Sequence, residues 1–260
     1  MKKILVIYFG IVALISLSTP ALAGKIKTIT FCTHPYAPFI ITDQDNNHKL
    51  LGGFDFDLAN AICKIVGAEC KFTMQQQLIT LIANLNAGDC DAWMSGLTIS
   101  PDRKQYLDFT EAYYPTSASL IAPKNSTFTA EPRDLKNKKV GVANGSNFVT
   151  YLDATYGSDI DMVKFGNEYN ALTALRTKKV DAVISDAPML QYWMEQKGNE
   201  GFRLIDLPSY NKEFALGKGC GIAVKKDNTK LLNALNQALT KIKADGTYDK
   251  IAKKYSMKAK

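Results

Sequence analysis

The sequence predicts an α/β protein made of two doubly wound lobes, and three patterns support this prediction. Short apolar segments alternate with segments whose apolar residues recur at helical spacing. The same alternation restarts near residue 139, after an interruption. The segment after residue 221 is too short to form a domain of its own. Alternating strands and helices are typical of parallel sheets with right-handed crossovers.

The first lobe is expected to begin as a β-α-β-α-β unit. We predict strands at 26–32, 71–74 and 91–94. One helix between them carries Phe54, Leu58, Ile62 and Ile65 at helical spacing and stops at Gly67. A second helix carries Leu78, Leu81, Ile82 and Leu85 and ends at 86–88.

The second lobe repeats the pattern with strands at 139–142, 161–165 and 182–185, each followed by a predicted helix. A strand at 221–224 and a helix at 228–244 then return to the first lobe. The predicted lobes are 24–114 plus 216–260, and 115–215. The chain crosses between them near 115–119 and 211–217, and two crossings can act as a hinge that closes around a ligand. One continuous sheet is the alternative.

The N-terminus has the pattern of a secretory signal peptide over residues 1–23. Lys2 and Lys3 precede an apolar run at 4–17, and Ala21 and Ala23 form a small-x-small cleavage site. An uncleaved anchor is the alternative. Nothing after residue 23 approaches the 18 or so apolar residues of a membrane span. We therefore expect an exported protein in the periplasm.

Composition indicates a globular protein, and the charge pattern does not favour a nucleic-acid partner. The 260 residues are 46% hydrophobic and carry a formal net charge of +7, but most basic residues are scattered. Scattered lysines on an exported chain argue against a nucleic-acid partner. No histidine and cysteine cluster has zinc spacing, so we expect neither metal nor cofactor.

Five cysteines enter an oxidising compartment if the chain is exported. Cys63 and Cys70 lie on either side of the helix stop at Gly67, and we expect a disulfide between them. The states of Cys32, Cys90 and Cys220 stay open, with at least one buried free thiol expected.

Ligands of open parallel sheets bind beyond the carboxyl ends of the strands. The loop after residue 94 combines Ser95, Gly96 and Thr98 with Arg103, and N–H donors with a guanidinium suit a carboxylate. A surface arginine with Ser100 as a helix cap is the alternative.

Three further strand ends carry candidate residues. Asp186 is placed to pair with an ammonium group, and Ser146 and Asn147 stand at a helix start that favours an anion. Helix capping is the alternative for both features, and for Asp186 the two roles can coexist. Tyr36 can offer its ring to a ligand, although a core position is the alternative. Together these groups describe a receptor for a zwitterion.

The chain resembles the polar amino-acid-binding proteins of bacterial ABC importers, the family 3 solute-binding proteins, and above all their arginine-binding and lysine/arginine/ornithine-binding members. The similarity spans nearly the whole mature chain. It rests on the segments 36–39, 53–58, 95–103, 141–146, 221–224 and 242–251. The resemblance implies a type II periplasmic-binding-protein fold, a monomer, and delivery of a free amino acid, with arginine the favoured ligand, to a membrane permease. The spacing of Cys63 and Cys70 also resembles a small disulfide of the members that bind basic amino acids.

The resemblance also implies a role for each site residue. Arg103 would hold the ligand carboxylate with Thr98 and the backbone at Asn147, while Asp186, Thr98 and the Gly96 carbonyl would take the ammonium. Tyr36 would stack on the ligand side chain. The remaining residues would line the pocket or its mouth: Ser95 and Ser146 in the pocket, Asp55 near the mouth.

Three positions depart from the family pattern. Thr33 replaces an aspartate of some lysine/arginine/ornithine-binding proteins, and Gly96 replaces a common serine. Leu78, or one of the glutamines at 75–77, replaces a second stacking aromatic, which removes part of a cation–π contribution. Two other functions remain: a periplasmic enzyme of the cyclohexadienyl dehydratase type, and the detached sensory domain of a receptor. We expect a binding protein rather than an enzyme, because His34 and His48 stand beside no nucleophile motif.

Overall fold

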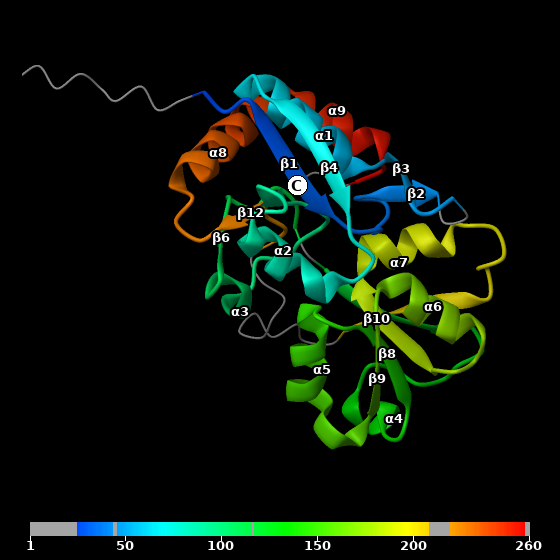
Figure 1. The fold of residues 1–260 in the computed structure, drawn as a ribbon. Helices are drawn as coiled ribbons and strands as arrows, with labels where there is room; N and C mark the ends of the chain where they lie inside the picture. Colours follow the sequence, from blue (N-terminus) through cyan, green and yellow to red (C-terminus); the bar gives the residue numbers. More distant parts are fainter. Residues whose placement is uncertain (1–24, 44–45, 116, 208–218, 258–260) are drawn as a thin grey trace, which may run out of the picture.

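Two five-stranded sheets form the centres of two lobes, one above the other in Figure 1. This computed structural model describes residues 25–43, 46–115, 117–207 and 219–257. The predicted signal peptide and the second predicted crossing, at 211–217, lie outside the described residues. The mixed α/β fold with two sheets confirms the predicted fold class.

The sheet of the first lobe has the order β4-β1-β5-β12-β6. Its strands are β1 (Thr28–Thr33), β4 (Glu69–Met74), β5 (Ala92–Trp93), β6 (Leu107–Phe109) and β12 (Ala223–Lys225). Strand β1 pairs in parallel with both β4 and β5, as the β-α-β-α-β prediction requires. Strand β12 is antiparallel to β5 and β6, so the late segment of the chain lies within this first sheet.

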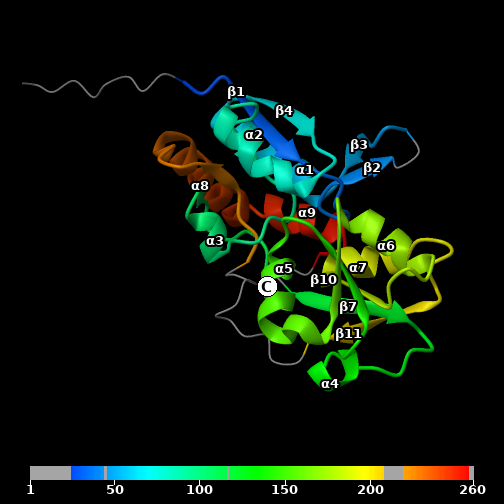
Figure 2. The same cartoon turned by 60° about the horizontal axis from the view of Figure 1, so that its bottom comes forward.

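Helices α1 (Phe54–Val66), α8 (Thr229–Ala244) and α9 (Thr247–Lys254) lie together beside the first sheet (Figure 2). Their apolar faces, including Leu58, Ile62 and Leu235, are fully buried in the main core. Gly67 ends α1 in the left-handed conformation, with φ of 73°. Its N–H donates to the Cys63 carbonyl at 2.8 Å. Glycine adopts this conformation without the steric cost of a side chain.

The sheet of the second lobe has the order β11-β7-β10-β8-β9. Its strands are β7 (Ala118–Pro123), β8 (Lys139–Ala143), β9 (Asp161–Phe165), β10 (Ala182–Asp186) and β11 (Phe202–Asp206). Three helices of eight or more residues accompany it: α5 (Asn147–Tyr156), α6 (Glu168–Arg176) and α7 (Ala187–Met194). Strands β8, β9 and β10 pair in parallel. Strand β7 is antiparallel to β10 and β11.

Shorter elements connect these layers. They are the hairpin β2 (Ile41–Asp43) with β3 (Lys49–Gly52), the 3₁₀ turns η1 (Leu78–Thr80) and η2 (Gly157–Asp159), and the helices α2 (Leu81–Ala87), α3 (Pro101–Lys104) and α4 (Pro132–Leu135). The predicted second helix of the first lobe therefore divides into η1 and α2.

Two disulfides lie in the first lobe. The predicted Cys63–Cys70 bond is present, with Cα atoms 5.8 Å apart. A second bond, which the sequence left open, joins Cys32 to Cys90 with Cα atoms 5.6 Å apart. Parallel pairing of β1 with β5 explains it, because Cys32 pairs with Trp93 and Cys90 lies just before that strand. Cys220 is the buried free thiol among the described cysteines.

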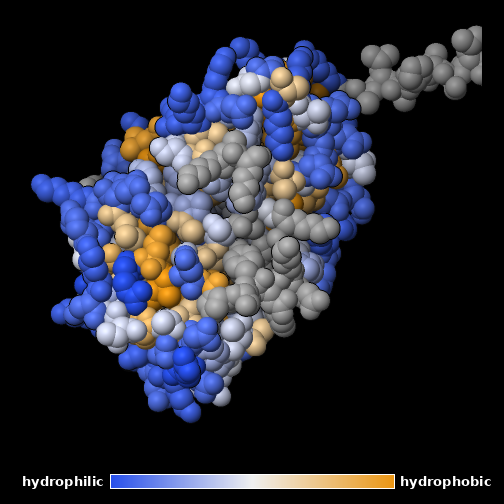
Figure 3. All heavy atoms as spheres, turned by 180° about the vertical axis from the view of Figure 1, so that it is seen from behind, coloured by the Kyte–Doolittle hydropathy of each residue, from blue (hydrophilic) through white to orange (hydrophobic). Residues whose placement is uncertain are grey.

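Polar side chains cover most of the rear face, and an apolar patch interrupts them in the lower half, where the second lobe lies (Figure 3). Among the described residues, no helix combines the length and the apolar character needed to cross a bilayer.

Candidate functional site

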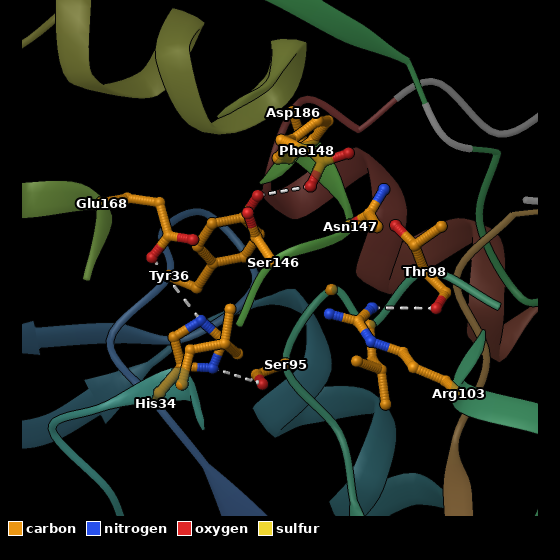
Figure 4. Close-up of a pocket in the computed structure, with 13 residues that line it drawn as sticks. His34, Tyr36, Ser95, Thr98, Arg103, Ser146, Asn147, Phe148, Glu168 and Asp186 are labelled. Carbon is orange, nitrogen blue, oxygen red and sulfur yellow. Dashed lines mark hydrogen bonds and ion pairs between the residues drawn. The ribbon is translucent and has the colours of Figure 1, made fainter. Parts of the chain in front are cut away.

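A pocket lies where the strand ends of the two lobes meet (Figure 4). Its empty space, which includes space open to solvent, is about 260 Å³. Its lining comprises His34, Tyr36, Leu78, Ser95, Gly96, Leu97, Thr98, Arg103, Ser146, Asn147, Phe148, Glu168 and Asp186. Every predicted ligand-binding residue except Asp55 is in this set.

Arg103 comes from the one-turn helix α3 and is 7% exposed. Its Nη1 donates to the Thr98 carbonyl at 3.0 Å. Its Cζ lies 5.4 Å from the centre of the Trp93 ring. The Ser100 hydroxyl accepts from the Arg103 backbone N–H at 3.3 Å, so Ser100 does cap the helix, but Arg103 is buried and is not a surface arginine. The cap and the carbonyl hold the guanidinium in the pocket, where burial lowers its pKa to about 10 and Asp186 partly offsets that effect.

Asp186 ends β10 and is 5% exposed. Its carboxylate makes no helix-cap bond, although it occupies the cap position of α7. It accepts a short hydrogen bond from the Tyr36 hydroxyl, which also lies 3.1 Å from the Ser185 hydroxyl. Burial raises the pKa of Asp186 to about 7. Tyr36 belongs to the first lobe and Asp186 to the second, so this contact joins the two lobes.

The start of α5 presents Ser146 and Asn147 to the pocket. Ser146 is 7% exposed, its hydroxyl makes no cap bond, and its Oγ has no hydrogen-bond partner in the described part of the chain. A buried hydroxyl without a partner is costly. The Ser146 hydroxyl is therefore available to a ligand.

Asp55 does not lie near the pocket mouth, and this expectation was wrong. The residue is 1% exposed within α1, behind the pocket wall. Its Oδ2 accepts from the Gly96 N–H at 2.6 Å and from the Tyr113 hydroxyl at 2.8 Å. Burial raises the pKa of Asp55 to about 7. Asp55 thus supports the pocket loop from behind.

Gly96 has a steric reason to be glycine. Its φ is +63°, and a Cβ at this position would come within 2.9 Å of the Tyr36 ring and 3.0 Å of Phe39. The missing side chain lets the Tyr36 ring lie against the loop. Leu78 lines the pocket at the start of η1. Thr33, in contrast, is fully buried outside the lining, and its hydroxyl donates to the Thr73 carbonyl at 3.3 Å.

Four lining residues were not among the predicted ligand contacts: His34, Leu97, Phe148 and Glu168. The sequence contained a signal for two of them. His34 directly follows β1, and Glu168 stands three positions after β9 ends at Phe165. The rule that ligands bind beyond strand ends applies to both.

His34 and Glu168 form a buried pair across the lobes, and each is 3% exposed. His34 Nε2 lies 3.8 Å from Glu168 Oε2, beyond hydrogen-bond distance. Burial lowers the pKa of His34 to about 3, with a contribution from Arg103. Burial raises the pKa of Glu168 to about 7. The imidazole is therefore neutral at physiological pH.

Other contacts also close the lobes on one another. The Asn167 side chain donates to the Gln76 carbonyl at 3.2 Å, and the Ala37 N–H donates to the Tyr169 hydroxyl at 3.3 Å. Arg103 Nη2 lies 3.4 Å from the Gly145 carbonyl. A Cβ at Gly145 would meet the backbone of Ile79 at 2.9 Å. Lining residues from both lobes therefore face one shared pocket.

The fold and site define a type II periplasmic binding protein, with a small polar pocket between two α/β lobes. Residues 29–258 match the family model of bacterial extracellular solute-binding proteins, family 3, and the chain belongs to that family. It is 34% identical over 258 residues to the histidine-binding periplasmic protein of Escherichia coli (strain K12), covering 98% of this chain and 97% of that protein.

Two solved structures extend the comparison. A Salmonella typhimurium periplasmic binding protein described as highly specific for arginine superposes with a TM-score of 0.80 at 36% identity, covering 88% of this chain and 99% of that one. An ancestral amino-acid-binding protein, described as a precursor of cyclohexadienyl dehydratase, gives 0.74 at 27% identity, covering 88% and 94%.

Proposed function

We propose that this protein is the periplasmic amino-acid-binding component of an ABC importer. It captures a free L-amino acid with a basic side chain, with arginine the favoured ligand, and delivers it to a membrane permease. Membership of family 3 supports the general role. The choice of ligand rests on the pocket and on the names of the relatives.

The observation that carries the proposal is the placement of Arg103 and Asp186 on opposite lobes of one pocket. A guanidinium can bind a carboxylate through two parallel hydrogen bonds, and a carboxylate pairs with an ammonium group. An α-amino acid offers both groups a few bonds apart. Buried charges are costly unless they are paired, so this pocket favours a ligand with both charges over one with a single charge.

A basic side chain fits the remaining charge of the lining. Among the described residues that line the pocket, Arg103 supplies the positive charge, and Asp186 and Glu168 supply two acids. A ligand that carries two positive groups and one negative group balances this set. The names of the relatives, which specify histidine and arginine, support the same class of ligand.

Binding is proposed to proceed by hinge closure. The hinge segments are those predicted near 115–119 and 211–217, between a first lobe of 24–114 plus 216–260 and a second lobe of 115–215. A ligand that touches residues of both lobes binds the closed form better than the open form, and so shifts the population toward closure. We further propose that residues 1–23 direct export to the periplasm and that the protein acts as a monomer.

Binding without chemistry is proposed, and the dehydratase type is the alternative. The likeness to a precursor of cyclohexadienyl dehydratase is the observation behind that alternative. An enzyme needs a positioned acid or base, and in this pocket the acids face a site suited to pairing with a cation. Turnover of a prephenate-like acid by the purified protein would contradict the proposal.

The test is a thermal-shift series on the mature protein, residues 24–260, freed of co-purified ligand by unfolding and refolding. The panel is the twenty amino acids with ornithine and citrulline. A ligand that binds only the folded state raises the melting temperature. We expect a large rise with arginine and smaller rises with lysine and ornithine. Shifts confined to neutral or acidic amino acids would contradict the basic ligand, and no shift at all would contradict amino-acid binding.

A further inference from the structure

Glu168 brings a second acid into the pocket from the second lobe. It is the first residue of α6, after the cap Asn167, whose side chain accepts from the Asn170 N–H at 2.9 Å and donates to the Gln76 carbonyl of the first lobe at 3.2 Å. The start of the helix is thus fixed against both lobes. Helix N-termini stabilise negative charge, so this position partly offsets the effect of burial on the Glu168 carboxyl.

The Glu168 carboxylate has an unused oxygen inside the pocket. Its Oε2 is buried and lacks a hydrogen-bond partner among the described residues, and the same holds for His34 Nε2 opposite it. Figure 4 places both groups on the side of the pocket away from Arg103 and Thr98. A buried carboxylate oxygen without a partner is strongly unfavourable, so this end of the pocket is incomplete without a donor.

The surrounding hydrogen bonds determine which protons face this end. The Trp93 Nε1–H donates to the Ser95 hydroxyl at 2.8 Å, and His34 Nδ1 lies 2.8 Å from the same oxygen. If the Ser95 O–H donates to His34 Nδ1, both bonds of Ser95 are satisfied and Nε2 carries the imidazole proton. Nε2 lies 3.8 Å from Glu168 Oε2, so a neutral His34 faces the carboxylate without supplying the positive charge that would neutralise it.

We propose that Glu168, with His34 facing it, is the subsite that binds the cationic end of the ligand side chain. This inference rests on the proposed amino-acid binding. Glu168 supplies an acid to the pocket, whereas Thr33 of the first lobe does not line it. The Thr33 hydroxyl donates to the Thr73 carbonyl instead. Because Glu168 lies on the second lobe and Arg103 on the first, recognition of the side-chain charge requires closure.

The test compares arginine with citrulline, which has nearly the same shape but no side-chain charge, by calorimetric titration of the mature protein. We expect the wild type to prefer arginine by about 30-fold or more, the range that charged hydrogen bonds provide. Glu168→Gln should reduce this preference to about threefold or less, through loss of arginine affinity. The exposed Glu131→Gln in the same lobe is the matched control and should leave it unchanged.

The outcomes separate this inference from the proposed function. If Glu168→Gln keeps the arginine preference, the subsite is wrong although amino-acid binding stands. If the wild type binds no amino acid, the proposed function fails, and the inference with it. The melting temperature of each variant without ligand confirms folding. His34→Gln should also reduce the preference, because His34 faces Glu168. A purely structural loss would instead weaken arginine and citrulline equally.

Discussion

The Tyr36 hydroxyl of the first lobe donates a hydrogen bond to the Asp186 carboxylate of the second, and Ser185 lies beside it at 3.1 Å. This bond joins the lobes through the group that we assign to the ligand ammonium. Closure and ligand binding therefore use the same carboxylate. A bond between the lobes that needs no ligand raises the population of the closed form.

Tyr36→Phe should shift the unliganded protein toward the open form. The variant keeps the ring against Gly96 but loses the bond to Asp186. In small-angle X-ray scattering, we expect a larger radius of gyration for the unliganded variant than for the wild type, and a larger compaction when arginine is added. Equal radii for the two unliganded proteins would show that this bond does not hold the lobes together.

Arg103→Ala should abolish binding of every amino acid, because the ligand carboxylate would be buried without its partner. Loss of one partner of a buried charge pair costs about 2–5 kcal/mol, which is roughly 30-fold or more in affinity. Calorimetric titration with arginine, lysine and citrulline measures the loss. The exposed Arg176→Ala serves as the control. Retained affinity in Arg103→Ala would contradict the carboxylate assignment.

Arginine affinity should rise with pH between 6 and 8. Burial raises the pKa of Asp186 and of Glu168 to about 7, and pairing with ligand cations stabilises the ionised forms and lowers both values. Binding therefore releases protons near pH 7, and affinity is lost as the pH falls through that value. The pKa of His34 at about 3 and that of Arg103 at about 10 lie outside this window.

The measurement is calorimetric titration at pH 6, 7 and 8, in two buffers of different ionisation enthalpy at each pH. We expect affinity to increase about tenfold or more across the range, since one group titrating at pH 7 changes its ionised fraction by about that factor. Binding that is independent of pH and releases no proton would contradict the assigned partners.

Asp55→Asn should gain stability relative to the wild type as the pH rises. Burial raises the pKa of the folded carboxyl to about 7 from an ordinary 3.8. The contribution of Asp55 to stability is thus full below pH 4 and is lost as the pH rises through 7. The amide can still accept from Gly96 and Tyr113. Melting temperatures at pH 5.5 and 8, with the exposed Asp89→Asn as control, measure the change; a constant difference would refute it.

The two disulfides should differ in their effect on stability. Cys32 and Cys90 are 58 positions apart, whereas Cys63 and Cys70 are 7 apart. Loop-closure entropy predicts a stabilisation of about 4 kcal/mol for the long loop and about 2.5 kcal/mol for the short one. Urea denaturation of the two paired Cys→Ala variants measures both losses. A larger loss for the 63/70 pair would contradict the entropic explanation.

The sequence by itself determined the repeated strand-and-helix pattern, the Cys63–Cys70 bond and most of the pocket. These features depend on local periodicity, on close spacing along the chain, and on the rule that side chains after parallel strands gather at one edge. This reasoning identified four pocket residues, because each follows a strand that the apolar pattern of the sequence predicts: Thr98, Arg103, Ser146 and Asp186.

Only the tertiary structure decided the rest. The Cys32–Cys90 bond depends on β1 pairing beside β5, which joins residues 58 positions apart. Asp55 has a polar side chain at a helix start in the sequence, yet the packing of α1 buries it behind Gly96. His34 and Glu168 lie opposite each other only because the two lobes meet. Contacts of this kind depend on how distant elements pack against each other. The local sequence pattern of one segment does not specify that packing.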